Sequence, residues 1–432
     1  MIESDVIAIT KLNESTAVNT FSLSEKPPVF TRGEGASLFD AAGQQFIDLV
    51  CGSAVTSYGY GAPWQIEAIK QASSSGVLHT GTRLPSPFRA EFYELLVNLM
   101  PKQLSAVHLS NSGSEAIETA VKAAQLATGR SAVISFYGAY HGRTSGALAL
   151  TASRRAHEGF DVRPFNVHFF PYPHQDCPPL PARNPSELSK SCLELLDRAL
   201  SNPLSGIRAG TVVVEAVQGV SGVVVPPVGF LKGLRDICDR HGLILIVDEI
   251  WNGFGRCGTW FAFQKEGIVP DLVTFGKAAS ASLPLAGVIG RPDLLKKWVP
   301  GSHTSTFQGN PIACAVASSN IRYASKNNLN GRVMHTVEPW LTRIANNAKH
   351  YAFVNATRIS GAQAGIDIVN SDGLPDGECL KSIQQKGLER GVLLYGGGWF
   401  GNTLMLVPPL TISEPEMRLA EEAITATLES IQ

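Results

Sequence analysis

The spacing of apolar residues changes along the chain, and each spacing predicts a type of element. Residues 29–50 alternate apolar and polar positions in short runs that glycines interrupt, which predicts antiparallel strands joined by turns. Residues 63–74 and 87–100 repeat apolar positions every three to four residues, as amphipathic helices do. Strands and helices are then expected to alternate, over residues 106–129, 131–144, 186–200, 211–217, 230–242, 243–249 and 271–277.

This alternation predicts an α/β fold with a mainly parallel sheet and helices on both of its faces. From Pro311 the pattern changes to a long helix, mixed segments and a closing amphipathic helix over residues 414–430. We therefore expect a large domain over residues 51–310 and a smaller α+β domain over residues 311–432. The N-terminal segment, residues 1–50, is expected to join the small domain.

Composition narrows the possible partners. Of the 432 residues, 44% are hydrophobic and 17% charged, and the formal net charge is −1, so no charge excess favours nucleic acid or an anionic membrane as partner. No apolar run approaches the length of about 18 residues that spans a bilayer, and no secretory leader is recognised. The seven cysteines are an odd number and are scattered, which argues against a disulfide framework and a zinc site and favours a reducing cytoplasm.

The stretch LILIVDEIWNGFGRCG, residues 243–258, raises the main question about function. Residues 243–247 suit a strand buried on both faces, yet Asp248 and Glu249 follow at once. Burying an unpaired carboxylate costs several kcal/mol, so each acid needs a partner. A strand ending in Asp-Glu also occurs at the magnesium site of nucleotide hydrolases. That class needs GxxxxGK[ST] upstream, and the only Gly-Lys pair, Gly276-Lys277, lies downstream and is followed by Ala278.

A second motif in this stretch, Gly253 to Gly258, matches GxGxxG. It does not directly follow its strand, and no acidic residue lies about 20 positions further on, as a nicotinamide-binding fingerprint requires. We therefore do not interpret it as a dinucleotide site.

Pyridoxal phosphate fits these residues better. Its ring nitrogen must stay protonated, and a buried aspartate such as Asp248 enforces that charge. Its aldehyde needs a lysine amine, and Lys277 closes the next strand along. Its phosphate suits the start of a helix, where Gly113 and Ser114 offer free N–H groups. Taken singly, each residue could equally be a cap or a solvated turn residue, but the three occur at three strand ends in the required order.

At this point the sequence resembles the class III aminotransferases among the fold-type I pyridoxal phosphate enzymes, the ornithine, GABA and omega-amino-acid type. The resemblance covers nearly the whole chain and is carried by SGSEAIETAVKAA, YHGRT, EAVQG, LIVDEIWNGFGRCG, TFGKAASASLPLAGVIG and STFQGNPIACA. It implies a large domain with a mainly parallel sheet covered by helices and a smaller α+β domain. It also implies a homodimer, because Thr306 would reach the phosphate of the neighbouring subunit.

The resemblance further implies roles for individual residues. Lys277 would form the internal aldimine and move the proton, Asp248 would hold the pyridinium, and Tyr140 would stack on the ring. Glu249 would support the loop after Asp248. The residues implied to bind the cofactor are Ser112, Gly113, Ser114, Tyr140, His141, Glu215, Gln218, Asp248, Ile250, Lys277 and Thr306.

Substrate contacts are where the chain departs from the commoner family pattern. Arg143 matches the arginine that holds a substrate carboxylate in ornithine- and GABA-type members. Members that use 2-oxoglutarate usually pair a glutamate with an arginine, whereas this chain has Val220 and Met405 at those two positions. Trp251 stands where glutamine is frequent. We expect Arg143, Trp251 and Met405 to contact the substrate.

The expected function is transfer of an amino group, from a terminal or omega amine, between an amino donor and an oxo acceptor. The mechanism would be ping-pong through the Lys277 aldimine. A racemase, epimerase or decarboxylase on the same scaffold stays open, because the shared motifs do not separate these reactions. A binding protein that has only kept the fold is less consistent with the intact pair Lys277 and Asp248. A cysteine-dependent hydrolase lacks any recognisable motif around its cysteines.

Overall fold

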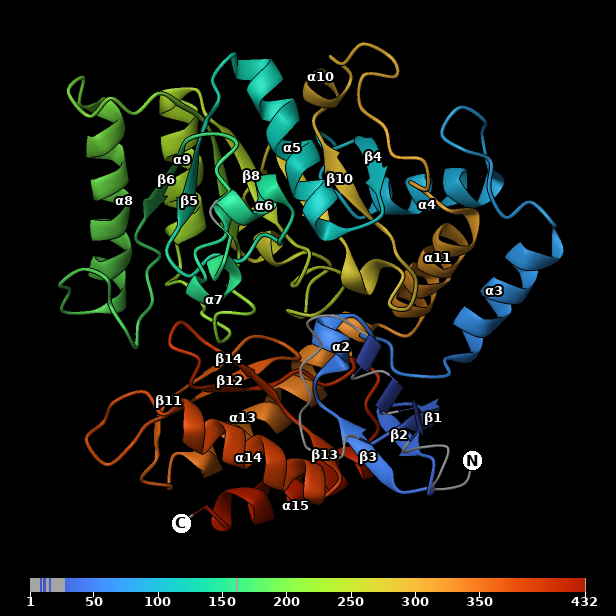
Figure 1. Ribbon diagram of the computed structural model, residues 1–432. Coiled ribbons are helices and arrows are strands. Elements are labelled where there is room, and N and C mark those ends of the chain that lie inside the picture. Colours follow the sequence, from blue (N-terminus) through green and yellow to red (C-terminus); the bar gives the residue numbers. More distant parts are fainter. Residues whose placement is uncertain (1–7, 10, 13–14, 17–27, 161, 432) are drawn as a thin grey trace. The chain divides into compact units, whose positions relative to one another are not determined.

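The computed structural model describes residues 8–9, 11–12, 15–16, 28–160 and 162–431. The chain divides into two compact units, residues 64–333 and residues 1–63 together with 334–432 (Figure 1). This division differs from the expected boundary at residue 310. Helix α11 (Pro311–Lys326) packs against α4 (Pro87–Asn98), and therefore belongs to the unit of residues 64–333.

The larger unit is built on a sheet that has seven strands in the described residues. Four of its six neighbouring pairs are parallel, which confirms the mainly parallel sheet. In spatial order the strands are β4 (Ala106–Ser110), β10 (Ala286–Gly290), β9 (Leu272–Phe275), β8 (Ile244–Asp248), β7 (Ala209–Glu215), β5 (Ala132–Phe136) and β6 (Val167–Phe170).

Strand β10 was not predicted from the apolar pattern. It is antiparallel to both of its neighbours, β4 and β9. Its five residues, AGVIG, begin with a small residue and contain two glycines, so neither alternation nor a long apolar run marks them as a strand. Gly287 lies so close to the backbone of β4 that a Cβ there would collide with the carbonyl oxygen of His108.

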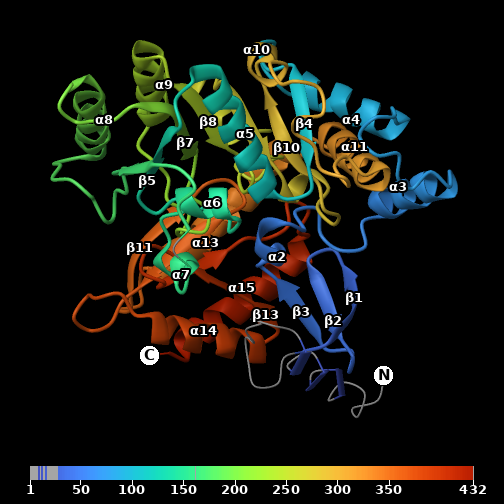
Figure 2. The same cartoon turned by 45° about the horizontal axis from the view of Figure 1, so that its top comes forward.

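Helices cover the sheet and bury its strands. Helix α5 (Gly113–Thr128) lies against β10, β9, β8 and β7, and α9 (Phe230–His241) packs on β8 (Figure 2). Helix α8 (Pro185–Ser201) packs in turn on α9. Leu245, Ile246 and Val247 of β8 are fully buried and Ile244 is partly buried, as expected for a strand covered on both faces. The remaining helical segments of this unit are α3 (Pro63–Ser74), α6 (Ser145–Leu150), α7 (Arg154–His157), η1 (Ala262–Glu266), η2 (Lys277–Ala279), α10 (Pro292–Leu295) and α12 (Leu329–Arg332).

The smaller unit contains two four-stranded sheets in its described part. The first begins with the antiparallel strands expected for residues 29–50. The elements are β1 (Phe30–Glu34), β2 (Ser37–Asp40), β3 (Gln45–Asp48) and β13 (Val392–Leu393) in one sheet, and β11 (Val354–Ile359), β12 (Ala364–Ile368), β15 (Thr403–Leu406) and β14 (Tyr395–Gly397) in the other. Its helical segments are α2 (Cys51–Ala54), the π-turn Val333–Val337 that begins at the boundary, α13 (Glu338–Ala348), α14 (Gly377–Glu389) and α15 (Glu414–Glu429).

None of the helices in the described residues is both long enough and apolar enough to cross a bilayer. The same residues contain no group of three His, Cys, Asp or Glu side chains placed to hold a metal ion.

Candidate active site

The register of the parallel strands aligns the polar residues at their carboxyl ends. Glu215, the last residue of β7, pairs with Asp248, the last residue of β8, and Asp248 pairs with Thr274 of β9. Ligands of open α/β sheets bind at this edge. Both carboxylates are buried, with 4% of Glu215 and 3% of Asp248 exposed, so each must find its partners inside the protein.

Asp248 has hydrogen-bond partners on both carboxylate oxygens. Its Oδ2 lies 2.7 Å from Nδ1 of His141. Its Oδ1 accepts a hydrogen bond from the backbone N–H of Ile250 at 3.0 Å and from the hydroxyl of Thr274 at 3.2 Å. The backbone N–H of His141 donates to Oγ1 of Thr151 at 3.0 Å, which fixes the histidine in turn. The aspartate is therefore held in one orientation, as required of a group that must face one atom of a ligand.

Glu215 connects the loop after β5 to the loop after β7. Its two oxygens accept hydrogen bonds from the backbone N–H of Tyr140 at 2.9 Å and of Gly219 at 3.1 Å. Burial raises the pKa of Glu215 to about 7 and outweighs these bonds and the nearby His141, which lower it. Gln218 adds a second link, since its side-chain amide donates to the carbonyl of Tyr137 at 2.8 Å. Through Glu215, the EAVQG motif therefore holds the backbone of Tyr140, which directly precedes His141, the partner of Asp248.

Lys277 follows β9 and has a strained backbone, with φ at +40°. Such a conformation costs a β-carbon residue about 1–3 kcal/mol and is most often found at functional sites. Burial of the amine lowers the pKa of Lys277 to about 8, although Asp248 and Glu215 act to raise it. Its Nζ lies 4.1 Å from the ring centroid of Trp251. Among the described residues the amine has no carboxylate as an ion-pair partner, so it is available to a ligand.

The start of α5 offers hydrogen-bond donors to an anion. Ser112 caps the helix by accepting from the N–H of Glu115 at 3.3 Å. As the first helical residues, Gly113 and Ser114 have no acceptor within the helix for their N–H groups, and no side chain of the described residues accepts from them. A Cβ on Gly113 would lie 3.0 Å from Cδ1 of Ile250, so glycine lets Ile250 pack directly on this turn.

The YHGRT loop lies against the same helix start. Gly142 has φ at +130°, and a Cβ there would collide with Oγ of Ser114. The N–H of Arg143 donates to that Oγ at 3.3 Å. Glu118 of α5 accepts from the Thr144 hydroxyl at 2.5 Å and from the N–H of Gly146 at 2.9 Å. The backbone of Arg143 is thereby fixed, while its side chain is exposed and has no ion-pair partner in the described part of the chain.

Trp251 is buried and packs on the glycine of EAVQG. A Cβ on Gly219 would lie 2.6 Å from Cδ1 and Cδ2 of the indole, closer than any real contact. The amine of Lys277 lies over the same ring, 4.1 Å from its centroid. Trp251 therefore turns towards the site, a point that the sequence left undecided.

Two buried charged residues near the site had no assigned catalytic role. Glu249 is fully buried and accepts from the N–H groups of Ala262 at 3.0 Å and Phe263 at 2.9 Å, which joins the loop after β8 to η1. Burial raises the pKa of Glu249 to about 8. Arg256 is also fully buried, and its charge lowers the pKa of Lys277. No role was assigned to Arg256 from the sequence, although GFGRCG matches GxGxxG and is part of the stretch that carries the family resemblance. The signal that could have found it is an arginine in a glycine-rich, otherwise mostly apolar loop.

Met405 and Thr306 are described by their own surroundings. Met405 is fully buried in β15 of the smaller unit. Thr306 is exposed on the segment that precedes α11. All predicted site residues except Met405 belong to the larger unit.

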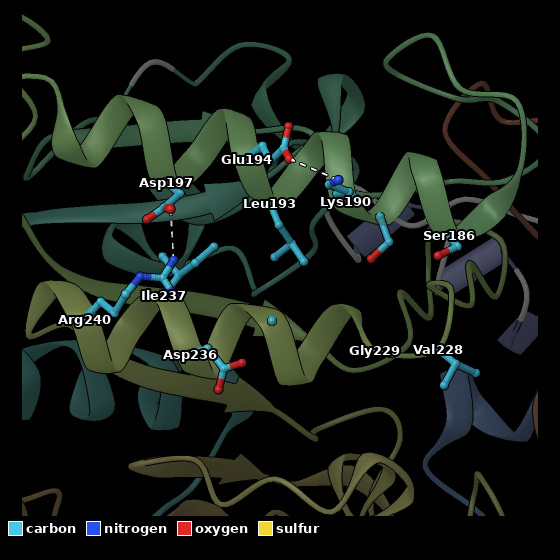
Figure 3. Close-up of a pocket in the computed structure, with 12 residues that line it drawn as sticks. Ser186, Lys190, Leu193, Glu194, Asp197, Val228, Gly229, Asp236, Ile237 and Arg240 are labelled. Carbon is cyan, nitrogen blue, oxygen red and sulfur yellow. Dashed lines mark ion pairs between the residues drawn. The ribbon is translucent and has the colours of Figure 1, made fainter.

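Two hollows of the larger unit lie away from the strand ends. A hollow of about 390 Å³ lies between α8 and α9, where Figure 3 shows charged side chains such as Lys190, Glu194 and Asp197 along its rim. Another, of about 350 Å³, is lined by residues of α4, β4 and α10. Neither is lined by a predicted site residue.

These residues fit pyridoxal phosphate. A buried carboxylate suits its ring nitrogen, an unpaired amine suits its aldehyde, and the two free N–H groups at the start of α5 suit its phosphate. Comparison with known protein families agrees, because the family model for "Aminotransferase class-III" matches residues 21–428, nearly the whole chain. The chain belongs to the class-III aminotransferases.

Individual class-III aminotransferases and their relatives are similar over most of their length. A diaminobutyrate–2-oxoglutarate aminotransferase of Rhizobium meliloti is 35% identical over 419 residues, 94% of this chain and 88% of the relative. An alanine/serine racemase of Pyrococcus horikoshii is 31% identical over 423 residues, 93% of this chain and 86% of the relative. The pyridoxal-phosphate-bound structure of an amine transaminase from an uncultivated Pseudomonas species matches with a TM-score of 0.88 and 26% identity, over 96% of this chain and 98% of that one.

These comparisons confirm the family, the fold class and the cofactor expected from the sequence. The protein is a class-III aminotransferase that depends on pyridoxal phosphate and acts on an amino donor and an oxo acceptor.

Proposed function

We propose that this aminotransferase takes the terminal amine of a donor that carries a distant carboxylate and passes it to an oxo acceptor in two successive half-reactions. The observation that supports this most directly is that a buried amine without an ion-pair partner in the described residues and a carboxylate held by hydrogen bonds lie at the ends of two adjoining strands. Lys277 supplies the amine and Asp248 the carboxylate. Arg143, exposed and without an ion-pair partner in the described residues, adds a candidate contact for the donor's carboxylate.

The cofactor would be held by groups already oriented by the protein. Asp248, fixed by His141 and Thr274, would keep the ring nitrogen protonated. Gly113 and Ser114 would donate to the phosphate from the start of α5. The other residues proposed to contact it are Ser112, Tyr140, Glu215, Gln218 and Ile250. When bound, pyridoxal phosphate supplies an electron sink for the charge left at the substrate carbon.

Lys277 is proposed to act as general base and acid for the proton on the carbon that carries the amine. A base works best when its pKa lies near the working pH, because it is then both partly free and strong enough to accept a proton. Burial brings the pKa of Lys277 to about 8, from an ordinary 10.5, and so meets this requirement. Its backbone at the end of β9 is strained, with φ at +40°, as is common at functional sites.

The proposed substrate class depends on charge. Arg143 can grip a carboxylate with two parallel hydrogen bonds. Val220 stands where a glutamate is common in members that use 2-oxoglutarate, and its counterpart Met405 is likewise apolar. A donor with one carboxylate, remote from the reacting amine, matches this set of charges. The Trp251 indole, held on Gly219, would limit the bulk that the donor can carry next to its amine.

We also propose a homodimer in which Thr306 contacts the phosphate bound by the other subunit. Support comes from the exposure of Thr306 and of its apolar neighbour Phe307, which is 65% exposed in the single chain. A cytoplasmic location stays a prediction.

Racemisation is the second candidate, because an alanine/serine racemase is 31% identical over 93% of this chain. Single-turnover absorbance with a panel of amino donors separates the reactions. A transaminase leaves pyridoxamine phosphate after the donor is consumed in the absence of acceptor, whereas a racemase restores the starting spectrum. Donors with a terminal amine and a remote carboxylate should react most completely. A spectrum that returns to its start with every donor, while the donor loses its chirality, would contradict transamination.

The same assay tests the role of Lys277. The variant Lys277→Ala should lower the rate of the half-reaction by about 10³-fold or more, since it removes the proposed general base and the covalent anchor together. Lys265→Ala, which changes a lysine of η1 outside the site, serves as the matched control and should react as the wild type does.

A further inference from the structure

The segment that carries Thr306 is fastened to the start of α5. Oγ of Ser305 accepts a hydrogen bond from the side-chain amide of Asn111 at 2.7 Å. Ser305 is also bonded within its own segment, because its backbone N–H donates to Oε1 of Gln308 at 2.7 Å. Ser305 therefore has a fixed position one residue before Thr306.

Asn111 is itself held by the first turn of the helix. Its backbone N–H and its side-chain amide both donate to Oε2 of Glu115, at 2.8 and 3.2 Å. The N–H of Glu115 in turn donates to the cap, Ser112. An amide carries two hydrogens, so Asn111 can serve Glu115 and Ser305 at once. The network thus joins Ser305 to the same turn whose next residues, Gly113 and Ser114, have free N–H groups.

A second contact fastens the segment further along α5. His303 lies with Nε2 2.8 Å from Oγ1 of Thr119 and with Nδ1 2.9 Å from Nζ of Lys122. His303 is thus held by α5 and Ser305 by Asn111, just before that helix, while Thr306 and Phe307, which follow, are exposed.

We infer that Asn111 and Ser305 are positioning residues that couple the two cofactor sites of the proposed homodimer. This inference rests on the proposed function, in which Thr306 completes the phosphate site of the other subunit. A phosphate bound to Gly113 and Ser114 holds the turn that begins at Asn111. Through Ser305 it also holds Thr306 where the second site needs it. Because binding linkage is reciprocal, each site then binds pyridoxal phosphate more tightly when the other is filled.

The test is a titration of the apoenzyme with pyridoxal phosphate, followed by native mass spectrometry that counts dimers with none, one or two cofactors. For the wild type we expect the second cofactor to bind about fivefold or more tightly than independent sites allow, the lower end of common coupling strengths. Ser305→Ala should return the populations to the statistical ratio. Asn111→Ala should also return the populations to the statistical ratio. Agreement between the two variants would show that the effect comes from the lost hydrogen bond and not from a change confined to position 305.

The matched control is Ser302→Ala. Ser302 lies in the same segment, is exposed, and its hydroxyl has no hydrogen bond among the described residues. This variant should retain the wild-type distribution. Thr306→Ala should weaken both sites and also abolish the coupling, since the proposed route passes through that residue.

Two outcomes overturn the coupling while leaving the proposed function intact. One is statistical loading of a wild-type dimer, and the other is an unchanged distribution in Ser305→Ala. A chain that stays monomeric, or that binds no pyridoxal phosphate at Lys277, would overturn the proposed homodimeric site as well. The same titration therefore distinguishes a failure of the coupling from a failure of the proposed homodimeric site.

Discussion

The buried residues at the strand ends and the exposed candidate residues of the larger unit differ in how many hydrogen-bond partners their side chains have within the single chain. Asp248, Glu215 and His141 are buried, and each carboxylate has bonds to side chains or backbone on both oxygens. The backbone N–H of Arg143 is bonded to Ser114, and Thr306 follows Ser305, which is bonded to Asn111, but Arg143 and Thr306 both expose their side chains to solvent.

This difference separates what the reaction needs from what the substrate and the partner supply. A group that must hold one protonation state or one direction is embedded, because burial and short hydrogen bonds remove its freedom. A group that awaits a carboxylate or a phosphate from outside must remain accessible, since its partner arrives with the ligand or with the other subunit.

The largest effect is expected from removing the charge of the buried acid. Asp248→Asn keeps the shape of the side chain but cannot keep the ring nitrogen protonated. We expect kcat for the first half-reaction to fall by about 10³-fold, the scale of losing one oriented electrostatic contact in an active site. Stopped-flow absorbance measures this rate. The control is Asp236→Asn on the exposed face of α9, and a rate within a few-fold of wild type in Asp248→Asn would contradict the proposed role.

An intermediate effect is expected for the exposed arginine. Arg143→Ala should raise KM for a carboxylated donor by about 10- to 100-fold, which corresponds to a lost charge-assisted hydrogen-bond pair of about 1.5–3 kcal/mol. The cofactor spectrum should hardly change, because Arg143 is not among the residues proposed to hold the ring. Steady-state kinetics with donors that carry or lack the carboxylate give the measurement. Arg418→Ala, an exposed arginine of α15, is the control, and an unaltered KM would refute the substrate assignment.

The smallest effect is a shift along the pH axis. Only the neutral form of Lys277 can attack an aldehyde, and burial lowers its pKa from an ordinary 10.5 to about 8. The rate at which the apoenzyme captures pyridoxal phosphate should therefore rise with pH through a midpoint near 8 and then level off. Absorbance after rapid mixing follows the capture. A midpoint near 10.5 would show that the amine is not desolvated as the structure has it.

Most of the fold was predictable because its elements are long and strongly patterned. The buried run of β8 and the periodic helices α5, α8 and α9 lie where the apolar spacing predicted them. Strand β10 was not predicted because its five small and apolar residues show no alternation of apolar and polar positions. The placement of α11 with the larger unit depends on its packing against α4, and such contacts between distant segments leave no mark in local spacing.

The candidate site was predictable to a similar degree. Asp248, Lys277 and the start of α5 follow from strand ends and helix starts, which are local features. The partners that fix them are not local: His141 lies 107 residues from Asp248 along the chain, and Ser305 lies 194 residues from Asn111. Spacing rules compare neighbours in sequence, so neither pair could be derived before the segments were folded together. The orientation of Trp251 depended likewise on a glycine in another loop.

The contact between Trp251 and Gly219 has a consequence for how this enzyme can change. A methyl group at position 219 would overlap the indole, so the two positions cannot be varied independently. In laboratory evolution, a smaller residue at 251 has to be accepted before any larger one at 219 is tolerated. The order of these steps, and not only their sum, therefore restricts which variants can be reached by single mutations.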